Sequence, residues 1–155
     1  MMQLFDRADR AIVRWMSDYG ITILRVSLGI VFFWFGVLKY FPHTSPAEVL
    51  ASQTILVLTL GHVGPVVSLP FLATWECLIG LGLITGVAKR ATLFLLFAQM
   101  AGTLLPLFFF PAQTFASIPF VPTLEGQYII KNLVLISAGI VIGATVRGGG
   151  AHDRV

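Results

Sequence analysis

Long apolar segments, separated by prolines, glycines and charged residues, dominate the pattern of this chain. Four of these segments hold roughly 20 residues each, and a helix of that length spans about 30 Å, the thickness of a bilayer's hydrocarbon core. We therefore predict an all-α membrane protein, a four-helix bundle that forms one domain over residues 1–155 with a short tail at 147–155. The predicted spans cover about residues 21–41, 70–88, 91–110 and 128–146.

The N-terminal segment, residues 3–19, has an amphipathic pattern instead of a continuous apolar one. Leu4, Ala8 and Ile12 recur at helical spacing, while aspartates and arginines occupy most of the other positions. This pattern predicts an interfacial helix that lies on the inner leaflet.

A further helix is predicted between the first two spans. Ser45-Pro46-Ala47-Glu48 combines a capping residue, an early proline and an acidic first turn, which together favour a helix start. The apolar run ends near Leu60, where glycines and prolines follow before a full span accumulates. We expect this helix to be re-entrant or to lie on the surface without crossing the membrane.

The basic residues support this topology. With four spans, Lys39 and Lys131 lie toward one membrane face, and eight other basic residues lie toward the opposite face. Such asymmetry places the richer face, and with it both termini, on the cytoplasmic side. The eight residues are Arg7, Arg10, Arg14, Arg25, Lys89, Arg90, Arg147 and Arg154.

Composition narrows the class of protein. Hydrophobic residues make up 57% of the chain and charged residues only 11%, against roughly 25% in soluble domains, so the excess apolar surface must face lipid. The basic residues form no stripe, which argues against nucleic-acid binding. Cys77 is the single cysteine and excludes an intrachain disulfide, and the three histidines share no metal-ligand spacing, so we predict no metal site.

One carboxylate lies at a depth where charge is costly. Glu76 is about six residues, roughly 9 Å, inside the second span and needs a partner there. Lys39 and Lys131 approach the same outer third of the bundle, so we predict a cluster of Lys39, Glu76 and Lys131. Polar and indole side chains at similar depth would extend this cluster into a pocket that opens toward the outer face. They are Asn132, Gln99, Thr103, Thr74, Trp34 and Trp75.

The predicted cluster has two interpretations. It either holds the helices in register, as polar contacts between membrane helices do, or it binds a flat or anionic ligand. Arg25, near the inner end of the first span, is expected to reach the interface as a cytoplasmic-side anchor. There it would pair with Asp18 or a lipid head group, or contact a partner subunit.

Two G-x-x-x-G motifs permit close helix contacts. Gly82 and Gly86 form one in the second span, and Gly139 and Gly143 form the other in the fourth. The motif fits packing within the bundle and equally a homo-oligomer interface.

Three stretches resemble the DoxX-like superfamily of small bacterial membrane proteins: RVSLGIVFFWFGVLK at 25–39, WECLIGLGL at 75–83 and YIIKN at 128–132. The resemblance implies a four-helix bundle in the bacterial cytoplasmic membrane and, for some members, an association with redox chemistry. It carries over to Arg25, Lys39, Glu76 and Lys131. The lone cysteine departs from a related methylamine-utilisation branch and puts its thiol-disulfide role in doubt.

Residues and resemblance together indicate a small accessory subunit of a membrane redox or oxidative-stress system, one that binds a quinone or another small ligand. Such a chain could be the membrane subunit of an oxidoreductase, although no self-contained catalytic motif is visible. The alternative is a non-catalytic scaffold that docks membrane partners through its glycine faces and N-terminal helix. Transport is less favoured, because four spans leave little room for a pore.

Overall fold

Helices make up most of the described chain. The structure, a computed structural model, describes residues 2–41, 44 and 48–147, with side chains from residue 6 onward. The elements are α1 (Met2–Leu38), α2 (Glu48–Leu58), α3 (Pro65–Thr85), α4 (Lys89–Leu104), α5 (Pro106–Phe109), α6 (Pro111–Thr114), β1 (Phe115–Ser117), β2 (Val121–Pro122) and α7 (Leu124–Ala144).

The all-α, four-span prediction is confirmed in the described residues. Four helical segments are long and apolar enough to cross a membrane. They are α1, α3, α4 together with α5, and α7. α3 starts at Pro65, earlier than the predicted Pro70, and continues through that proline. Pro106 lacks a backbone N–H and divides the third span into α4 and α5.

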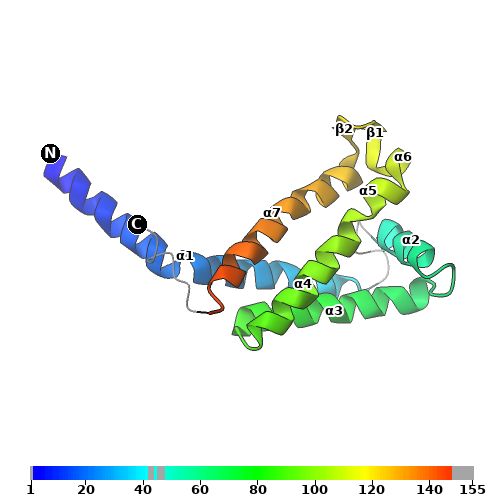
Figure 1. Cartoon of the computed structure of the whole chain (residues 1–155), viewed down its shortest axis with the longest axis horizontal. Coiled ribbons are helices and arrows are strands. Elements are labelled where there is room, and N and C mark those ends of the chain that lie inside the picture. The colour runs from blue at the N-terminus through cyan, green and yellow to red at the C-terminus, as the bar shows by residue number, and fades with distance from the viewer. Residues whose placement is uncertain (1, 42–43, 45–47, 148–155) are drawn as a thin grey trace.

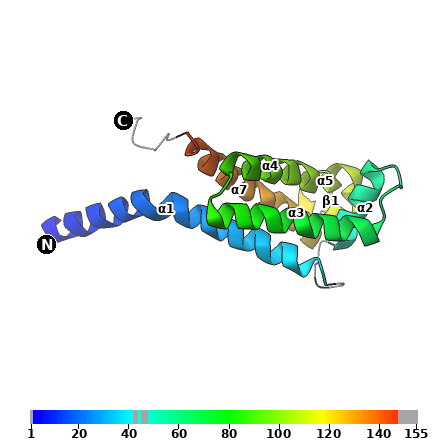
Figure 2. The same ribbon diagram turned by 90° about the horizontal axis from the view of Figure 1, so that it is seen from below.

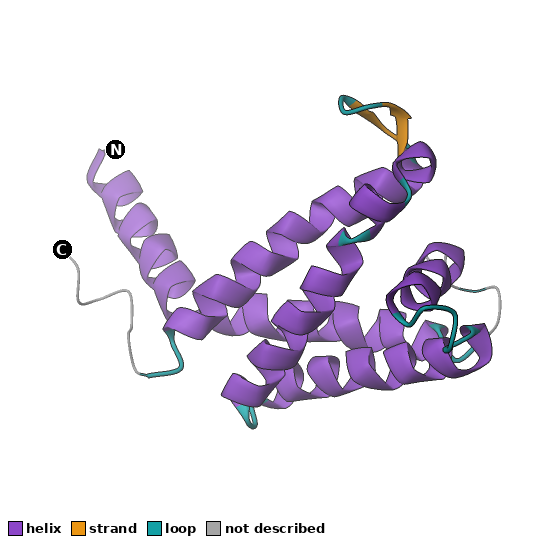
Figure 3. Cartoon of the chain, turned by 45° about the vertical axis from the view of Figure 1, so that its right-hand side comes forward, coloured by secondary structure: helices purple, strands orange, loops and turns teal. Residues whose placement is uncertain are grey.

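The spanning helices form two pairs arranged as a V. α1 packs along α3, and α4 packs along α7; the pairs meet near the α3–α4 turn and separate toward the opposite end (Figures 1 and 3). α2 lies at the wide end, against α3 and α5. The short strands β1 and β2 pair antiparallel above that end, between α6 and α7.

Glycines bring α1 and α3 together. A Cβ atom at Gly80 would lie 2.5 Å from the backbone nitrogen of Phe33, and one at Gly29 would lie 2.9 Å from the carbonyl oxygen of Gly80. A Cβ at Gly36 would lie 2.9 Å from the backbone nitrogen of Cys77. Real Cβ atoms do not approach backbone this closely, so the contact depends on glycine at these positions.

Two glycines of the G-x-x-x-G motifs pack inside the bundle. Gly82 of α3 faces Thr92 of α4, and a Cβ at Gly139 of α7 would lie 3.1 Å from Leu96 of α4. Gly86 has a different role, because it ends α3 in the left-handed conformation with φ of 72° and donates its N–H to Gly82. These contacts favour packing within the bundle, the first of the two predicted roles.

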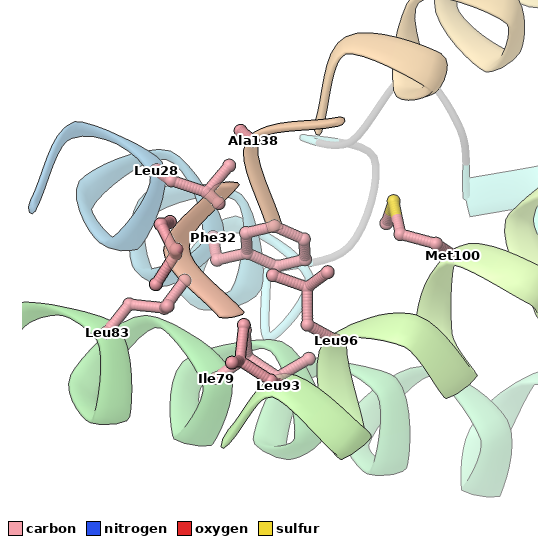
Figure 4. Packing of buried hydrophobic residues seen from close by; sticks show 9 residues of the cluster. Leu28, Phe32, Ile79, Leu83, Leu93, Leu96, Met100 and Ala138 are labelled. Carbon is pink, nitrogen blue, oxygen red and sulfur yellow. The ribbon is translucent and has the colours of Figure 1, made fainter. Parts of the chain in front are cut away.

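The hydrophobic core joins all four spans where the two pairs meet (Figure 4). Ile79 and Leu96 are fully buried at its centre, from α3 and α4 respectively. The cluster contains Leu28, Phe32, Ile79, Leu83, Leu93, Leu96, Met100, Ala138 and Ile142.

α1 is one unbroken helix of 37 residues. Residues 3–19 are helical as predicted, but no turn separates them from the first span, so the prediction of a separate interfacial helix is wrong in that respect. Gly20 alone does not end a helix, and no proline stands beside it. The N-terminal half extends away from the bundle (Figure 2) and exposes Ile12, Trp15 and Met16.

α2 exposes several apolar side chains. Leu50, Ser52 and Thr54 are buried, and the two hydroxyls donate to backbone carbonyls of their own helix, whereas Val49 and residues 56–58 are exposed. With 11 residues, α2 is about 16 Å long, too short to cross. Exposed apolar side chains suit a helix surrounded by hydrocarbon, which favours the re-entrant alternative over a helix at the water surface.

Gly80→Ala is expected to destabilise the bundle by about 1–3 kcal/mol, because the new methyl group overlaps the backbone of α1. Thermal unfolding in detergent, followed by circular dichroism, measures the effect. The matched control is Gly102→Ala in α4, where a Cβ meets no atom within 4 Å and the helix gains about 0.5–1 kcal/mol. Equal melting temperatures for the two variants would contradict the close α1–α3 contact.

Candidate ligand-binding site

Glu76 of α3 is held by two polar side chains from other helices. One carboxylate oxygen, Oε2, lies 2.5 Å from Nζ of Lys39, and the other, Oε1, accepts a hydrogen bond of 2.9 Å from Nε2 of Gln99 on α4. The side chains of Lys39 and Glu76 are each only 9% exposed. The ion pair therefore lies in the interior of the bundle.

The glycine contact between α1 and α3 positions this pair. Gly36 lies against Cys77 and within 3.0 Å of Glu76 Cβ, measured from its hypothetical Cβ. One turn later α1 ends, and the N–H of Lys39 bonds to the carbonyl of Gly36 at 3.1 Å, which tightens the last turn. Lys39 thus leaves α1 beside the carboxylate.

Lys39 and Gln99 offset the cost of burying the Glu76 carboxylate at this depth. A lone charge in hydrocarbon costs several kcal/mol, whereas a close ion pair with a further hydrogen bond offsets much of that cost. Gln99 supplies this hydrogen bond and is itself buried, with 8% of its surface exposed. The burial of the Glu76 carboxylate therefore depends on both Lys39 and Gln99.

These three residues line a cavity of about 360 Å³ at the wide end of the bundle. The volume falls within the range of about 300–1,000 Å³ that is typical of small-molecule sites. α1, α2, α3, α4 and α7 all contribute walls, which are mainly apolar. The apolar lining includes Phe32, Phe35, Leu50, Ile55, Leu72, Met100, Ile129 and Leu135.

Polar groups in the cavity keep hydrogen-bonding capacity. Within the described part of the chain, the side-chain amide of Asn132 has no hydrogen-bond partner, although it lines the cavity. Lys39 makes one described hydrogen bond and carries three N–H donors. Thr103 also lines the cavity, but its hydroxyl donates to the Met100 carbonyl at 2.9 Å. Donors therefore remain for a ligand oxygen.

The prediction that Lys131 belongs to the cluster with Lys39 and Glu76 is wrong. Lys131 is exposed, and its amine lies 5.3 Å from the ring centroid of Tyr128 on the same helix rather than beside Glu76. Lys131 and Asn132 are neighbours on α7, so they point about 100° apart, and Asn132 is the one that lines the cavity. Lys39 and Gln99 are thus the partners of Glu76.

The two predicted tryptophans do not wall the cavity. Trp34 is 65% exposed on the outside of α1, and Trp75 donates its indole N–H to the carbonyl of Leu95 at 3.1 Å. Thr74 bonds to the Tyr40 hydroxyl at 2.7 Å, also outside the cavity. Of the predicted site residues, the structure brings Lys39, Glu76, Gln99, Thr103 and Asn132 to the cavity.

Sequence reasoning missed the contribution of α2 and the start of α7. Thr54 of α2 and both Glu125 and Tyr128 of α7 line the cavity. The buried hydroxyls of α2 are a signal in the sequence, because Ser52, Gln53 and Thr54 interrupt an otherwise apolar run. No comparable signal marks which face of α7 turns inward.

Arg25 belongs to the opposite end of the bundle. Its guanidinium donates to the carbonyl oxygens of Leu83 and Ile84, the latter at 3.0 Å, at the C-terminal end of α3. Gly86 follows in the left-handed conformation, and its hypothetical Cβ would lie 3.0 Å from the guanidinium. The expected partners, Asp18 or a lipid head group, are replaced by the unpaired carbonyls of a helix end.

Comparison of the chain with protein-family models, with curated proteins and with solved structures gave no match.

Replacing one member of the ion pair leaves a buried charge without a partner, so Lys39→Met is expected to cost about 3–5 kcal/mol of stability. The double variant Lys39→Met with Glu76→Gln removes both charges and should recover most of this loss. Melting temperatures of the single and double variants measure the coupling.

Lys131→Met is the matched control, since it removes an exposed lysine on α7 and should leave the melting temperature unchanged. If Lys131→Met were as harmful as Lys39→Met, or if the double variant were no better than the single one, the pairing described here would be wrong.

Proposed function

We propose that this chain is a membrane protein that binds a small amphiphilic ligand, with a flat oxygen-bearing head of the quinone type, in the cavity at the wide end of its bundle. The observation that carries the proposal is the buried cluster of Lys39, Glu76 and Gln99 at the wall of an otherwise apolar cavity. A structural ion pair alone requires no cavity beside it.

The polar groups suit a head that both accepts and donates hydrogen bonds. A carbonyl oxygen of the ligand would accept from the Lys39 ammonium or the Asn132 amide, and a hydroxyl of its reduced form would donate to the Glu76 carboxylate. The apolar walls, with Phe32 and Phe35 from α1, suit a ring and the start of a hydrocarbon tail. Most small-molecule sites combine few polar groups with apolar walls in this way.

The walls also favour a ligand that arrives from the lipid phase. Phe35 of α1 and Leu58 of α2 line the cavity and are 49% and 52% exposed, so their outer surfaces face the surroundings of the bundle. α1 and α2 both pack on α3 and have little contact with each other. The side of the cavity between them is therefore bordered by apolar side chains rather than by a continuous helix contact.

The resemblance to the DoxX-like superfamily supports a role beside redox enzymes. We propose that the chain belongs to that superfamily and is the accessory subunit of a redox or oxidative-stress system. It would lie in the bacterial cytoplasmic membrane with both termini in the cytoplasm. Lys39 and Glu76, two of the positions that carry the resemblance, are the paired residues of the cavity. A subunit of this kind would hold a quinone for a partner that performs the electron transfer.

A cavity-filling variant tests this proposal with little risk to the fold. Gly102 lines the cavity, and a Cβ there meets no heavy atom within 4 Å, so a larger side chain can be introduced at this position to occupy the cavity. We expect Gly102→Leu to weaken binding of a short-tailed benzoquinone at least about tenfold, a loss of about 1.4 kcal/mol, because one leucine takes the volume that the ring needs. Thermal shift and equilibrium binding in detergent measure the change.

Gly20→Leu is the matched control, since Gly20 also has open space around its Cβ but lies in α1 away from the cavity. It should bind the probe as the unaltered chain does. If the unaltered protein neither retains a quinone from native membranes nor responds to the probe, the quinone proposal fails. If Gly102→Leu binds the probe normally, the ligand lies elsewhere.

A further inference from the structure

A second, shallow groove lies at the narrow end of the bundle, between α4 and α7. Apolar side chains and two arginines, Arg90 and Arg147, line it. Arg90 belongs to the first turn of α4, and Arg147 follows the end of α7, so both lie where a predicted span meets the membrane surface. The lining consists of Arg90, Leu93, Phe94, Phe97, Gly143, Val146 and Arg147.

We propose that this groove binds one anionic phospholipid, with the phosphate between the two arginines and the start of an acyl chain along Phe94 and Phe97. Neither Arg90 nor Arg147 has an ion-pair or hydrogen-bond partner among the described residues. A guanidinium binds phosphate with two parallel hydrogen bonds, so a pair of them forms a site for a phosphate group.

The apolar part of the groove selects a lipid over a free anion. Phe94 is 71% exposed and Phe97 36% exposed, and Phe97 lies seven residues, or about 10 Å, along α4 from Arg90. A soluble phosphate would use only the two arginines and leave this surface unused. An amphiphile with a negative head and a hydrocarbon chain uses both, as in other basic pockets between membrane helices.

Gly143 leaves room in the groove. A Cβ there would meet only Leu93, at the ordinary contact distance of 3.6 Å, so a larger side chain can be placed at this position. A larger side chain at this position would occupy the path of the acyl chain and leave both arginines in place. Head-group attraction and chain packing can therefore be tested separately.

The experiment compares the full-length protein in nanodiscs of phosphatidylcholine alone and of phosphatidylcholine with added phosphatidylglycerol. Both lipids carry a phosphate, but only phosphatidylglycerol has a net negative charge. We expect the anionic lipid to raise the melting temperature, and native mass spectrometry to show one retained phosphatidylglycerol. Inorganic phosphate added to the phosphatidylcholine nanodiscs should give no shift.

Arg90→Gln with Arg147→Gln should lower retention of phosphatidylglycerol about tenfold or more, because both charge-assisted contacts are lost. Arg10→Gln with Arg14→Gln removes the same charge from the exposed N-terminal part of α1 and should retain the lipid. Gly143→Leu should also lower retention of phosphatidylglycerol, although it leaves both arginines in place. Equal retention by all three variants would overturn the proposal, as would a shift with inorganic phosphate equal to that with phosphatidylglycerol.

Discussion

The ion pair between Lys39 and Glu76 sets the main constraint on this structure. A carboxylate in a helix surrounded by hydrocarbon must have a partner, and a lysine at the end of α1 reaches it only if α1 and α3 lie almost in backbone contact. Gly36 and Gly80 provide this approach, and Gln99 satisfies the second carboxylate oxygen from α4. The close glycine contact thus positions the two charges beside each other.

The same V-shaped packing produces two different environments. Where the helix pairs meet, large apolar side chains such as Ile79 and Leu96 fill the interior completely. Where the pairs separate, the space exceeds what Phe32 and Met100 can fill, and α2 covers part of it without closing it. Lys39, Glu76 and Gln99 lie at this looser end, and this juxtaposition of charge with unfilled apolar space is the basis of the proposed binding site.

Much of the architecture follows from hydropathy alone, because segment length against bilayer thickness leaves few alternatives. The pairing of Lys39 with Glu76 was also predictable, since the cost of a buried carboxylate demands a nearby amine. Lys131 was misplaced because depth along a helix says nothing about which face a residue occupies. Arg25 was expected at the interface, but bonding to the end of α3 depends on where that helix stops, which Gly86 determines through its backbone conformation. The continuity of α1 was missed because an amphipathic pattern does not by itself mark a break.

α1 connects the two ends of the molecule as a single rod about 55 Å long. Its N-terminal half extends away from the bundle. Near the middle of α1, Arg25 donates a hydrogen bond to the C-terminal end of α3, and Lys39 follows the last residue of α1 beside the cavity. Backbone hydrogen bonds run without interruption from one half to the other. A protein bound to the exposed half would therefore be joined to the lysine beside the cavity through a single continuous helix.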